Sequence, residues 1–254
     1  MRLLAGSPIR TSVLLSLSAL PGLALSARPL AAQAAVHDSL IRRTAPARPV
    51  IRLWEAGALA GLTAFALTID QSVRNNVQED RTAFRNHLSD AGNALGNGIY
   101  VYPALLAGTL GGRALKSKTL EGVSWRALES TALAGMGVEV VKTLVGRRRP
   151  NVSPDDAFTF RGLTVKDNSF PSGHTAVAFA LATSLAHETR PLWSHALFYT
   201  GATLTGFARV NDDRHWLSDT VVGAAMGIMS ARMVQRWHRP ILVGPGVVRV
   251  SATF

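Results

Sequence analysis

Three short clusters in this chain combine residues that bind phosphate with histidines that can react with it. They read KTLVGRRRP at Lys142–Pro150, PSGH at Pro171–His174 and RVNDDRHWLSD at Arg209–Asp219. Arginine, lysine and free backbone N–H groups bind phosphoryl oxygens, and a histidine can attack phosphorus or transfer a proton. Together the clusters predict a site that holds a phosphoryl group and attacks it with a histidine.

The first cluster contributes two cations of different shape. Lys142 and Arg149 are seven residues apart, two helical turns, so we expect both on one face of a helix that Pro150 ends. A guanidinium group can bind two phosphate oxygens at once, whereas an ammonium group is a compact point charge. The alternative is that these cations, like the neighbouring Arg147 and Arg148, only face solvent or the negative end of the helix dipole.

The second cluster has the pattern of a helix N-terminus. Ser172 and Gly173 come just before an apolar run at Thr175–Leu185, so the N–H groups of the first turn should be free to bind an anion. His174 would lie in that turn, where a side chain with a pKa near about 6.5 can act as a general acid. The alternative is that Ser172 only caps the helix and the histidine is incidental.

The third cluster pairs a histidine with a carboxylate. His215 and Asp219 are four residues apart at the start of an expected helix, Trp216–Val234, which places the carboxylate beside the imidazole ring. A carboxylate bonded to one ring nitrogen fixes the tautomer and leaves the other nitrogen free to attack. Two alternatives are a surface contact and a divalent metal site that includes Asp212 and Asp213.

The sequences KTLVGRRRP, PSGH and ARVNDDRHWLSD, in this order, resemble the signature of the superfamily of type-2 phosphatidic acid phosphatases, bacterial class A acid phosphatases and vanadium haloperoxidases. The resemblance implies that His215 is the nucleophile and forms a phosphohistidine, that Asp219 orients it, and that His174 protonates the leaving oxygen. It also implies which groups hold the phosphoryl oxygens: Lys142, Arg149, Ser172, the amide of Gly173, and Arg209. One position departs from the signature, because Ala208 stands where the family usually has serine before the arginine.

These residues predict phosphate chemistry without a metal. Three cations and a helix N-terminus can stabilise the charge on a transferring phosphoryl group. The chain has no cysteine, and of its seven histidines only His174 and His215 fall in a motif, so no zinc or iron ligand set is apparent. We therefore expect a phosphatase with no cofactor, although vanadate could occupy the phosphate site. A vanadium haloperoxidase, a phosphotransferase and a non-catalytic binding protein of the envelope are the alternatives.

Apolar segments rich in glycine and alanine recur along the chain and indicate helices. They predict an all-α fold, a six-helix bundle of the phosphatidic acid phosphatase type 2/haloperoxidase type. Pairs of glycines four residues apart should let helices pack closely. The expected helices are Leu53–Ile69, Ala94–Leu110, Ala127–Val145, Thr175–Ala186, Leu192–Ala208 and Leu217–Val234.

The first residues have the layout of a secretory signal peptide. Arg2 and Arg10 flank the start of an apolar stretch at Ser12–Leu25, which leads to small residues near Ala34, with no acidic residue before that point. We expect a signal peptide at 1–34, a helical domain at 35–240 and a tail at 241–254. We expect the domain to be exported to the periplasm or cell envelope as a helical bundle that does not cross the membrane, with basic loops available for association with the membrane surface. The alternative is a bundle that lies within the membrane.

The formal charge of +11 limits the partners that need to be considered. The arginines are scattered and aromatic residues are few, so nucleic acid is not an expected partner. The expected partner is a phosphorylated small molecule or a lipid phosphate. The sequence does not indicate the oligomeric state or which of these substrates is used.

Overall fold

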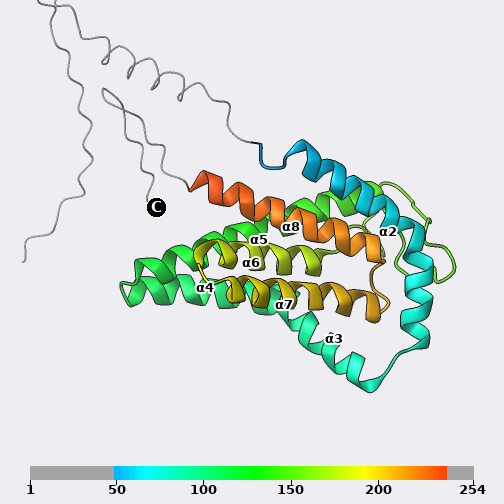
Figure 1. Cartoon of the computed structure of the whole chain (residues 1–254), viewed down its shortest axis with the longest axis horizontal. Coiled ribbons are helices and arrows are strands. Elements are labelled where there is room, and N and C mark those ends of the chain that lie inside the picture. Colours follow the sequence, from blue (N-terminus) through cyan, green and yellow to red (C-terminus); the bar gives the residue numbers. More distant parts are fainter. Residues whose placement is uncertain (1–48, 239–254) are drawn as a thin grey trace, which may run out of the picture. The chain divides into compact units, whose positions relative to one another are not determined.

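The computed structural model describes residues 49–238, and within this range the chain forms helices and no strand (Figure 1). The all-α prediction is confirmed, but the number of helices differs. Seven helices are present in the described range: α2 (Leu53–Glu79), α3 (Ala83–Gly96), α4 (Gly98–Ala114), α5 (Lys118–Val145), α6 (Gly173–Glu188), α7 (Leu192–Asn211) and α8 (Leu217–Trp237).

The helix that the sequence analysis missed is α3. Its sequence, AFRNHLSDAGNALG, is polar on most of its surface and has no long apolar run. It begins at a good N-cap, because the hydroxyl of Thr82 accepts a hydrogen bond from the amide of Arg85. It is held by its packing against α7, where a Cβ added to Gly92 would lie 2.5 Å from the carbonyl oxygen of Leu204. Close tertiary contact, rather than local hydrophobicity, therefore specifies this helix.

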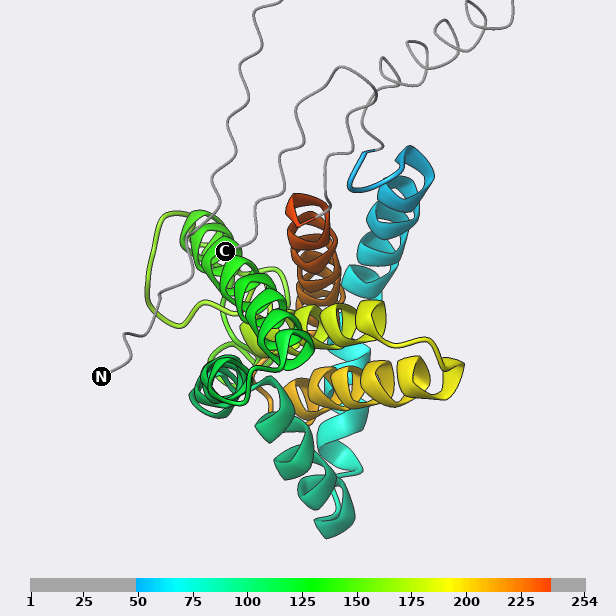
Figure 2. The same cartoon turned by 90° about the vertical axis from the view of Figure 1, so that its left-hand side faces the viewer.

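Helix α6 lies among α5, α7 and α8, which pack against it from different sides (Figure 2). The contacts of α6 with α5 and α8 are made largely by small side chains. One buried cluster consists of Ala134, Val138, Ala176 and Ala180, with Met226 packed against it. Small residues allow the helix axes to approach closely, so the start of α6 and the start of α8 are fixed relative to each other.

Glycines on α8 make this close approach possible. A Cβ on Gly223 would lie 2.5 Å from the carbonyl oxygen of Ser172, and one on Gly227 would lie 2.3 Å from that of Ala176. The same expectation is wrong for the glycine pair on α2, because Gly57 and Gly61 have no atom within 4 Å of an added Cβ. Spacing alone did not distinguish glycines at helix contacts from glycines on an open face.

The first cluster is not a single helix, which corrects the sequence prediction. Helix α5 ends at Val145, and Gly146 caps it with a left-handed backbone at φ 62°. The chain then runs extended, and Arg147 and Arg148 form isolated β-bridges with the link that follows. Arg149 therefore approaches the site from a loop and not from the same helix as Lys142, and Pro150 does not end the helix.

The predicted signal peptide at 1–34 and the predicted tail at 241–254 lie outside the described residues. Their assignment stays a prediction.

Candidate active site

The second cluster lies at the start of α6, as predicted. Helix α6 begins at Gly173, and His174 lies in its first turn. Ser172 is fully buried, its amide donates to the carbonyl oxygen of Asp219 at 3.0 Å, and its hydroxyl lies 2.9 Å from that of Thr175. Because the serine hydroxyl does not cap the helix, the first N–H groups of α6 are available to an anion.

The third cluster places His215 in the turn between α7 and α8. The His215 amide donates to the carbonyl oxygen of Arg209 at 3.1 Å, and the side chain is 3% exposed. Its Nδ1 lies 3.6 Å from Oδ2 of Asp219, which also accepts from the amide of Trp216 at 2.9 Å. The first distance is longer than a hydrogen bond, but catalytic hydrogen bonds commonly shorten when substrate binds. The carboxylate is on the side of the ring that the sequence spacing predicted.

The three predicted phosphate-binding cations come from three different elements. Lys142 lies on α5, Arg149 on the loop after it, and Arg209 in the last turn of α7. The Lys142 ammonium is 3.7 Å from the position that a Cβ on Gly173 would occupy, so it lies directly beside the start of α6. Burial lowers the pKa of the Arg149 and Arg209 guanidinium groups, and neighbouring arginines add to this effect. An anion bound among these cations would offset both the cost of burying the positive charges and the repulsion between them.

The two histidines are neutral near pH 7. Burial, and to a smaller extent the charges of Arg209, His215, Lys142 and Arg149, together lower the pKa of His174 to about 4. The pKa of His215 is also lowered to about 4, because burial, helped by the charges of Arg209 and Lys142, outweighs the opposing effect of Asp219. The tertiary structure thus brings all of these groups within electrostatic range of each other. A neutral His215 has a free lone pair for attack on phosphorus.

A cavity of about 880 Å³ opens at His174. Lys142, Gly173, His174 and Glu139 contribute its polar part, and the Glu139 carboxylate lies 3.2 Å from the Lys142 ammonium group. Much of the remaining wall is apolar and comes from α4, α5 and α6, in particular from Tyr102, Ala132, Met136, Val140 and Val177. Lys142 and His174 therefore share one cavity with an apolar wall, whereas His215, Arg149 and Arg209 are not among its lining residues.

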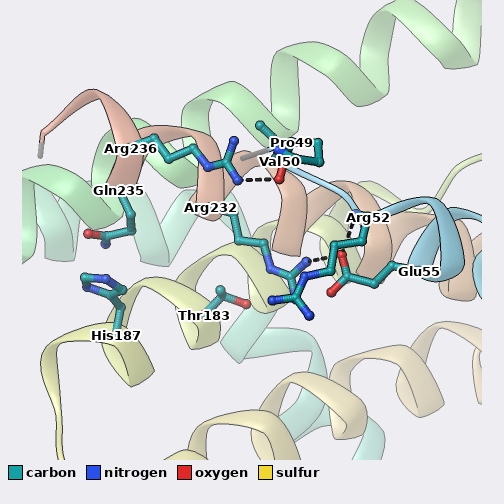
Figure 3. A pocket seen from close by; sticks show the side chains of 9 residues that line it. All are labelled: Pro49, Val50, Arg52, Glu55, Thr183, His187, Arg232, Gln235 and Arg236. Atoms are coloured by element: carbon teal, nitrogen blue, oxygen red, sulfur yellow. Dashed lines mark hydrogen bonds and ion pairs between the residues drawn. The ribbon is translucent and has the colours of Figure 1, made fainter. Parts of the chain in front are cut away.

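A second cavity, of about 460 Å³, is basic and is lined by residues at the other ends of α6 and α8 (Figure 3). Three arginines line it, Arg52, Arg232 and Arg236, with Glu55 as a counter-charge that lies 3.1 Å from Arg232. His187 on this cavity is thirteen residues along α6 from His174, about 20 Å at 1.5 Å per residue. This cavity is therefore separate from the candidate active site.

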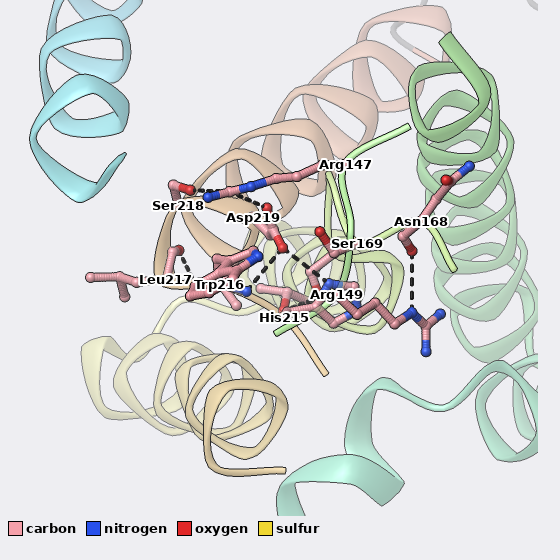
Figure 4. A network of polar contacts seen from close by, with 12 residues as sticks. Arg147, Arg149, Asn168, Ser169, His215, Trp216, Leu217, Ser218 and Asp219 are labelled. Carbon is pink, nitrogen blue, oxygen red and sulfur yellow. Dashed lines mark hydrogen bonds and ion pairs between the residues drawn. The ribbon is translucent and has the colours of Figure 1, made fainter. Parts of the chain in front are cut away.

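Two residues of the site were missed or misread in the sequence. The sequence analysis gave Arg147 and Arg148 no role in the site. Arg147 is in fact fully buried and donates to Oδ1 of Asp219 at 2.7 Å (Figure 4). Its other ion-pair partner is Asp70 of α2, at 2.7 Å. The available signal was an acidic residue directly after the apolar run of α2, which is costly to bury without a partner.

The alternative of a metal at Asp212 and Asp213 gains no support from their contacts. Asp212 accepts from the amide group of Asn93 at 2.7 Å, and Asp213 forms two 2.8 Å bonds with Arg74. Within residues 49–238 no group of three or more His, Cys, Asp or Glu side chains is placed to hold a metal ion. Ala208, the departure from the signature, is fully buried and packs against Gly92 of α3.

Comparison with known proteins agrees with the resemblance. The PAP2 superfamily model matches residues 124–241, a segment that contains all three clusters. The chain is 41% identical, over 100 residues, to a lipid A 1-phosphatase of Porphyromonas gingivalis, and this match covers 39% of the chain. The matched part is only 20% of that relative's length. The predicted resemblance is thus confirmed over the part of the chain that contains the site.

Two solved structures align with this chain. The first transmembrane PAP2 type phosphatidylglycerolphosphate phosphatase from Bacillus subtilis aligns with a TM-score of 0.56 and 17% identity, over 73% of this chain and 96% of its own. LpxE of Aquifex aeolicus aligns with a TM-score of 0.49 and 22% identity, over 66% of this chain and 95% of its own. At such identities the Bacillus subtilis structure supports the fold alone.

Proposed function

We propose that this chain, whose residues 124–241 match the PAP2 superfamily model, is a phosphatase that hydrolyses lipid phosphates through a phosphohistidine. The observation that carries this proposal is the shared cavity, in which His174 and Lys142 adjoin an apolar wall from α4, α5 and α6. A soluble phosphomonoester needs only the polar part of this cavity. A lipid phosphate would use both parts, with its phosphate at the cations and its acyl chain along the wall.

The first step is the transfer of the phosphoryl group to His215. The free ring nitrogen attacks phosphorus, the bond from phosphorus to the lipid oxygen breaks, and His174 gives its proton to that oxygen. Asp219 holds the His215 ring and stabilises the positive charge that the ring gains. Because the pKa of His174 is about 4 without an anion, the bound phosphate dianion has to raise it before His174 can act as the acid.

The second step is hydrolysis of the phosphohistidine. His174, now neutral, takes a proton from a water molecule, the water oxygen attacks phosphorus, and the bond to the His215 nitrogen breaks. During both steps the phosphoryl oxygens are held by Lys142, Arg149, Arg209, Ser172 and the amide of Gly173. We expect this cycle to need no metal ion, because the charge is stabilised by cations of the chain and by the helix N-terminus.

An apolar outer surface supports a location at a membrane of the cell envelope. Large hydrophobic side chains are exposed on α4 and α5, such as Ile99 at 76% and Met136 at 64%. Helix α2 is long and apolar enough to cross a membrane, and only 11% of its most apolar window is buried. Such a surface lies at low cost against lipid. The arginines of the second cavity would then face anionic headgroups.

Phosphate release by the full chain, with excess chelator present, tests the function. The substrates are micellar lipid A, phosphatidic acid, phosphatidylglycerol phosphate and a soluble aryl phosphate, and the variants are His215→Ala and, as a matched control, His187→Ala. We expect release from lipid phosphates that His215→Ala abolishes and His187→Ala leaves unchanged. Release from the aryl phosphate alone would contradict the lipid substrate. No release, with halide oxidation after vanadate loading, would favour a haloperoxidase.

A further inference from the structure

The guanidinium group of Arg147 is enclosed on all sides and uses all of its N–H donors. Nε donates to the carbonyl oxygen of Ala157 at 2.9 Å, and Nη2 donates to the same oxygen and to Oδ2 of Asp70, both at 2.7 Å. Nη1 donates to Oγ of Ser218 at 2.6 Å and to Oδ1 of Asp219 at 2.7 Å. A guanidinium group has five N–H bonds, so Arg147 cannot turn without losing a hydrogen bond.

Aromatic rings complete the enclosure of Arg147. Its guanidinium carbon lies 5.3 Å from the centre of the Trp216 ring and 5.5 Å from that of Phe160. Cation–π contacts at this distance are favourable, and they exclude water from the ion pairs. The Arg147 side chain is therefore a rigid contact for the oxygen of Asp219 that faces away from His215.

Asp70 connects this group to α2, outside the segment that matches the superfamily model. Its Oδ1 accepts from the amide of Ser218 at 2.9 Å, and its Oδ2 accepts from the hydroxyl of Ser218 at 2.6 Å as well as from Arg147. Both Asp70 and Asp219 have no exposed side-chain surface. One buried cation thus lies between two buried carboxylates.

The charges of this group leave one negative charge in excess. With Arg147 positive and Asp70 and Asp219 negative, these three side chains leave one negative charge, which a positive His215 ring would balance together with the nearby Arg149. An unbalanced buried charge is costly, so the group favours a positive ring. Without Asp70, the charge of Arg147 would cancel that of Asp219 and leave none for the ring.

We propose that Arg147 and Asp70 are positioning residues of this site. Arg147 fixes one oxygen of Asp219, and Asp70 neutralises the charge of Arg147, so that the charge of Asp219 remains available to stabilise the positive His215 ring. This proposal rests on the proposed function of His215 as the nucleophile. The other charged or titratable groups that act on the pair of His215 and Asp219 are Arg209 of α7, Lys142 of α5, His174 of α6 and Arg149 of the loop after α5. They belong to the phosphate site and are left unchanged in the test.

The test measures kcat, KM and anion binding for Asp70→Asn. The control is Arg74→Met, which breaks another ion pair between α2 and the segment before α8, the pair with Asp213 at 2.8 Å, but does not contact Asp219. We expect Asp70→Asn to lower kcat by about 10- to 100-fold, the range for removal of a partner that orients a functional histidine, with little change in KM. Arg74→Met should change kcat by less than about 3-fold, within the range of a partly exposed ion pair.

A rescue experiment separates charge from packing. Arg147→Met leaves two uncompensated carboxylates and should lower kcat at least as much as Asp70→Asn. Adding Asp70→Asn to Arg147→Met restores a single negative charge, so the double variant should recover part of the activity. If Arg147→Met does not fold, the proposal is tested by comparing the kcat of Asp70→Asn with that of the double variant and that of Arg74→Met. Equal losses in Asp70→Asn and Arg74→Met would overturn the proposal, as would a double variant worse than both single variants.

A binding measurement keeps the inference distinct from the proposed function. Orthovanadate can form a bond to a histidine nitrogen and so place charge on the ring, whereas sulfate binds the same cations without such a bond. From the shift in melting temperature, we expect Asp70→Asn to weaken orthovanadate binding by about 10-fold and sulfate binding by less than about 2-fold. A loss of orthovanadate binding without an equal loss of sulfate binding supports the positioning role. This result would stand even if wild type released no phosphate, because that outcome would contradict only the proposed phosphatase function. Equal losses for both anions would refute the role itself.

Discussion

Replacing Gly223 with alanine should damage the active site from the opposite side of a helix contact. The added Cβ would lie 2.5 Å from the carbonyl oxygen of Ser172, whereas ordinary contacts begin at 3.4 Å. The obstacle is backbone, which cannot rotate away, so α8 and the start of α6 have to separate by nearly 1 Å. The residue that moves, Ser172, also donates its amide to Asp219.

The expected magnitude follows from two opposing effects. Alanine is favoured over glycine in a helix by about 1 kcal/mol, and forcing extra volume into a packed contact costs about 1–3 kcal/mol. We expect a net loss of about 2 kcal/mol, because the clash is with backbone, and hence a melting temperature lower by about 4–8 °C. A displacement of about 1 Å at a catalytic centre can cost on the order of 100-fold, so kcat/KM should fall by that factor.

The matched control is Gly61→Ala on α2. No atom lies within 4 Å of its added Cβ, so only the helix preference applies, and this variant should melt about 2–4 °C higher with unchanged kcat/KM. The assay is thermal unfolding followed by phosphate release from a micellar lipid phosphate. If Gly223→Ala keeps kcat/KM within about 2-fold of wild type, the start of α6 does not depend on the α6–α8 contact, and the reasoning is wrong.

Four further outcomes are expected. The free energy of unfolding should fall as the pH drops from 6.5 towards 4, because the unfolded chain binds protons at His215 and His174 more readily than the folded chain does. The fully buried His215 should contribute up to about 3 kcal/mol of this fall, and the less buried His174 a smaller amount of the same sign. Chemical denaturation across that pH range measures the fall, and a flat profile for wild type would contradict the buried neutral rings. His215→Ala should flatten part of this profile and leave less than about 1% of the activity, as loss of a nucleophile does. Arg149→Lys should raise KM or lower kcat/KM by about 10-fold, because a lysine cannot bind two phosphate oxygens at once. Kinetics equal to those of wild type would show that Arg149 does not bind the phosphate. Met136→Asp should raise KM for lipid phosphates but not for an aryl phosphate, because it places a charge in the apolar wall of the cavity. An equal rise in KM for both substrates would argue against binding of the acyl chain at this wall.

The sequence by itself determined the local features of the site. A serine and a glycine before an apolar run identified the start of α6, and the spacing of His215 and Asp219 placed carboxylate and ring on one side. These features depend on backbone geometry within a few residues, which propensity and periodicity describe. The all-α fold follows from the same kind of local pattern.

Tertiary structure alone decided the features that join distant segments. The ion pair between Arg147 and Asp70 connects residues 77 apart, and no local pattern distinguished the buried Arg147 from the partly exposed Arg148 and Arg149. Gly223 and Gly61 have the same spacing pattern, yet only the first meets another helix. A buried ion pair or a close helix contact depends on what lies opposite in space, and the sequence of one segment does not contain that information.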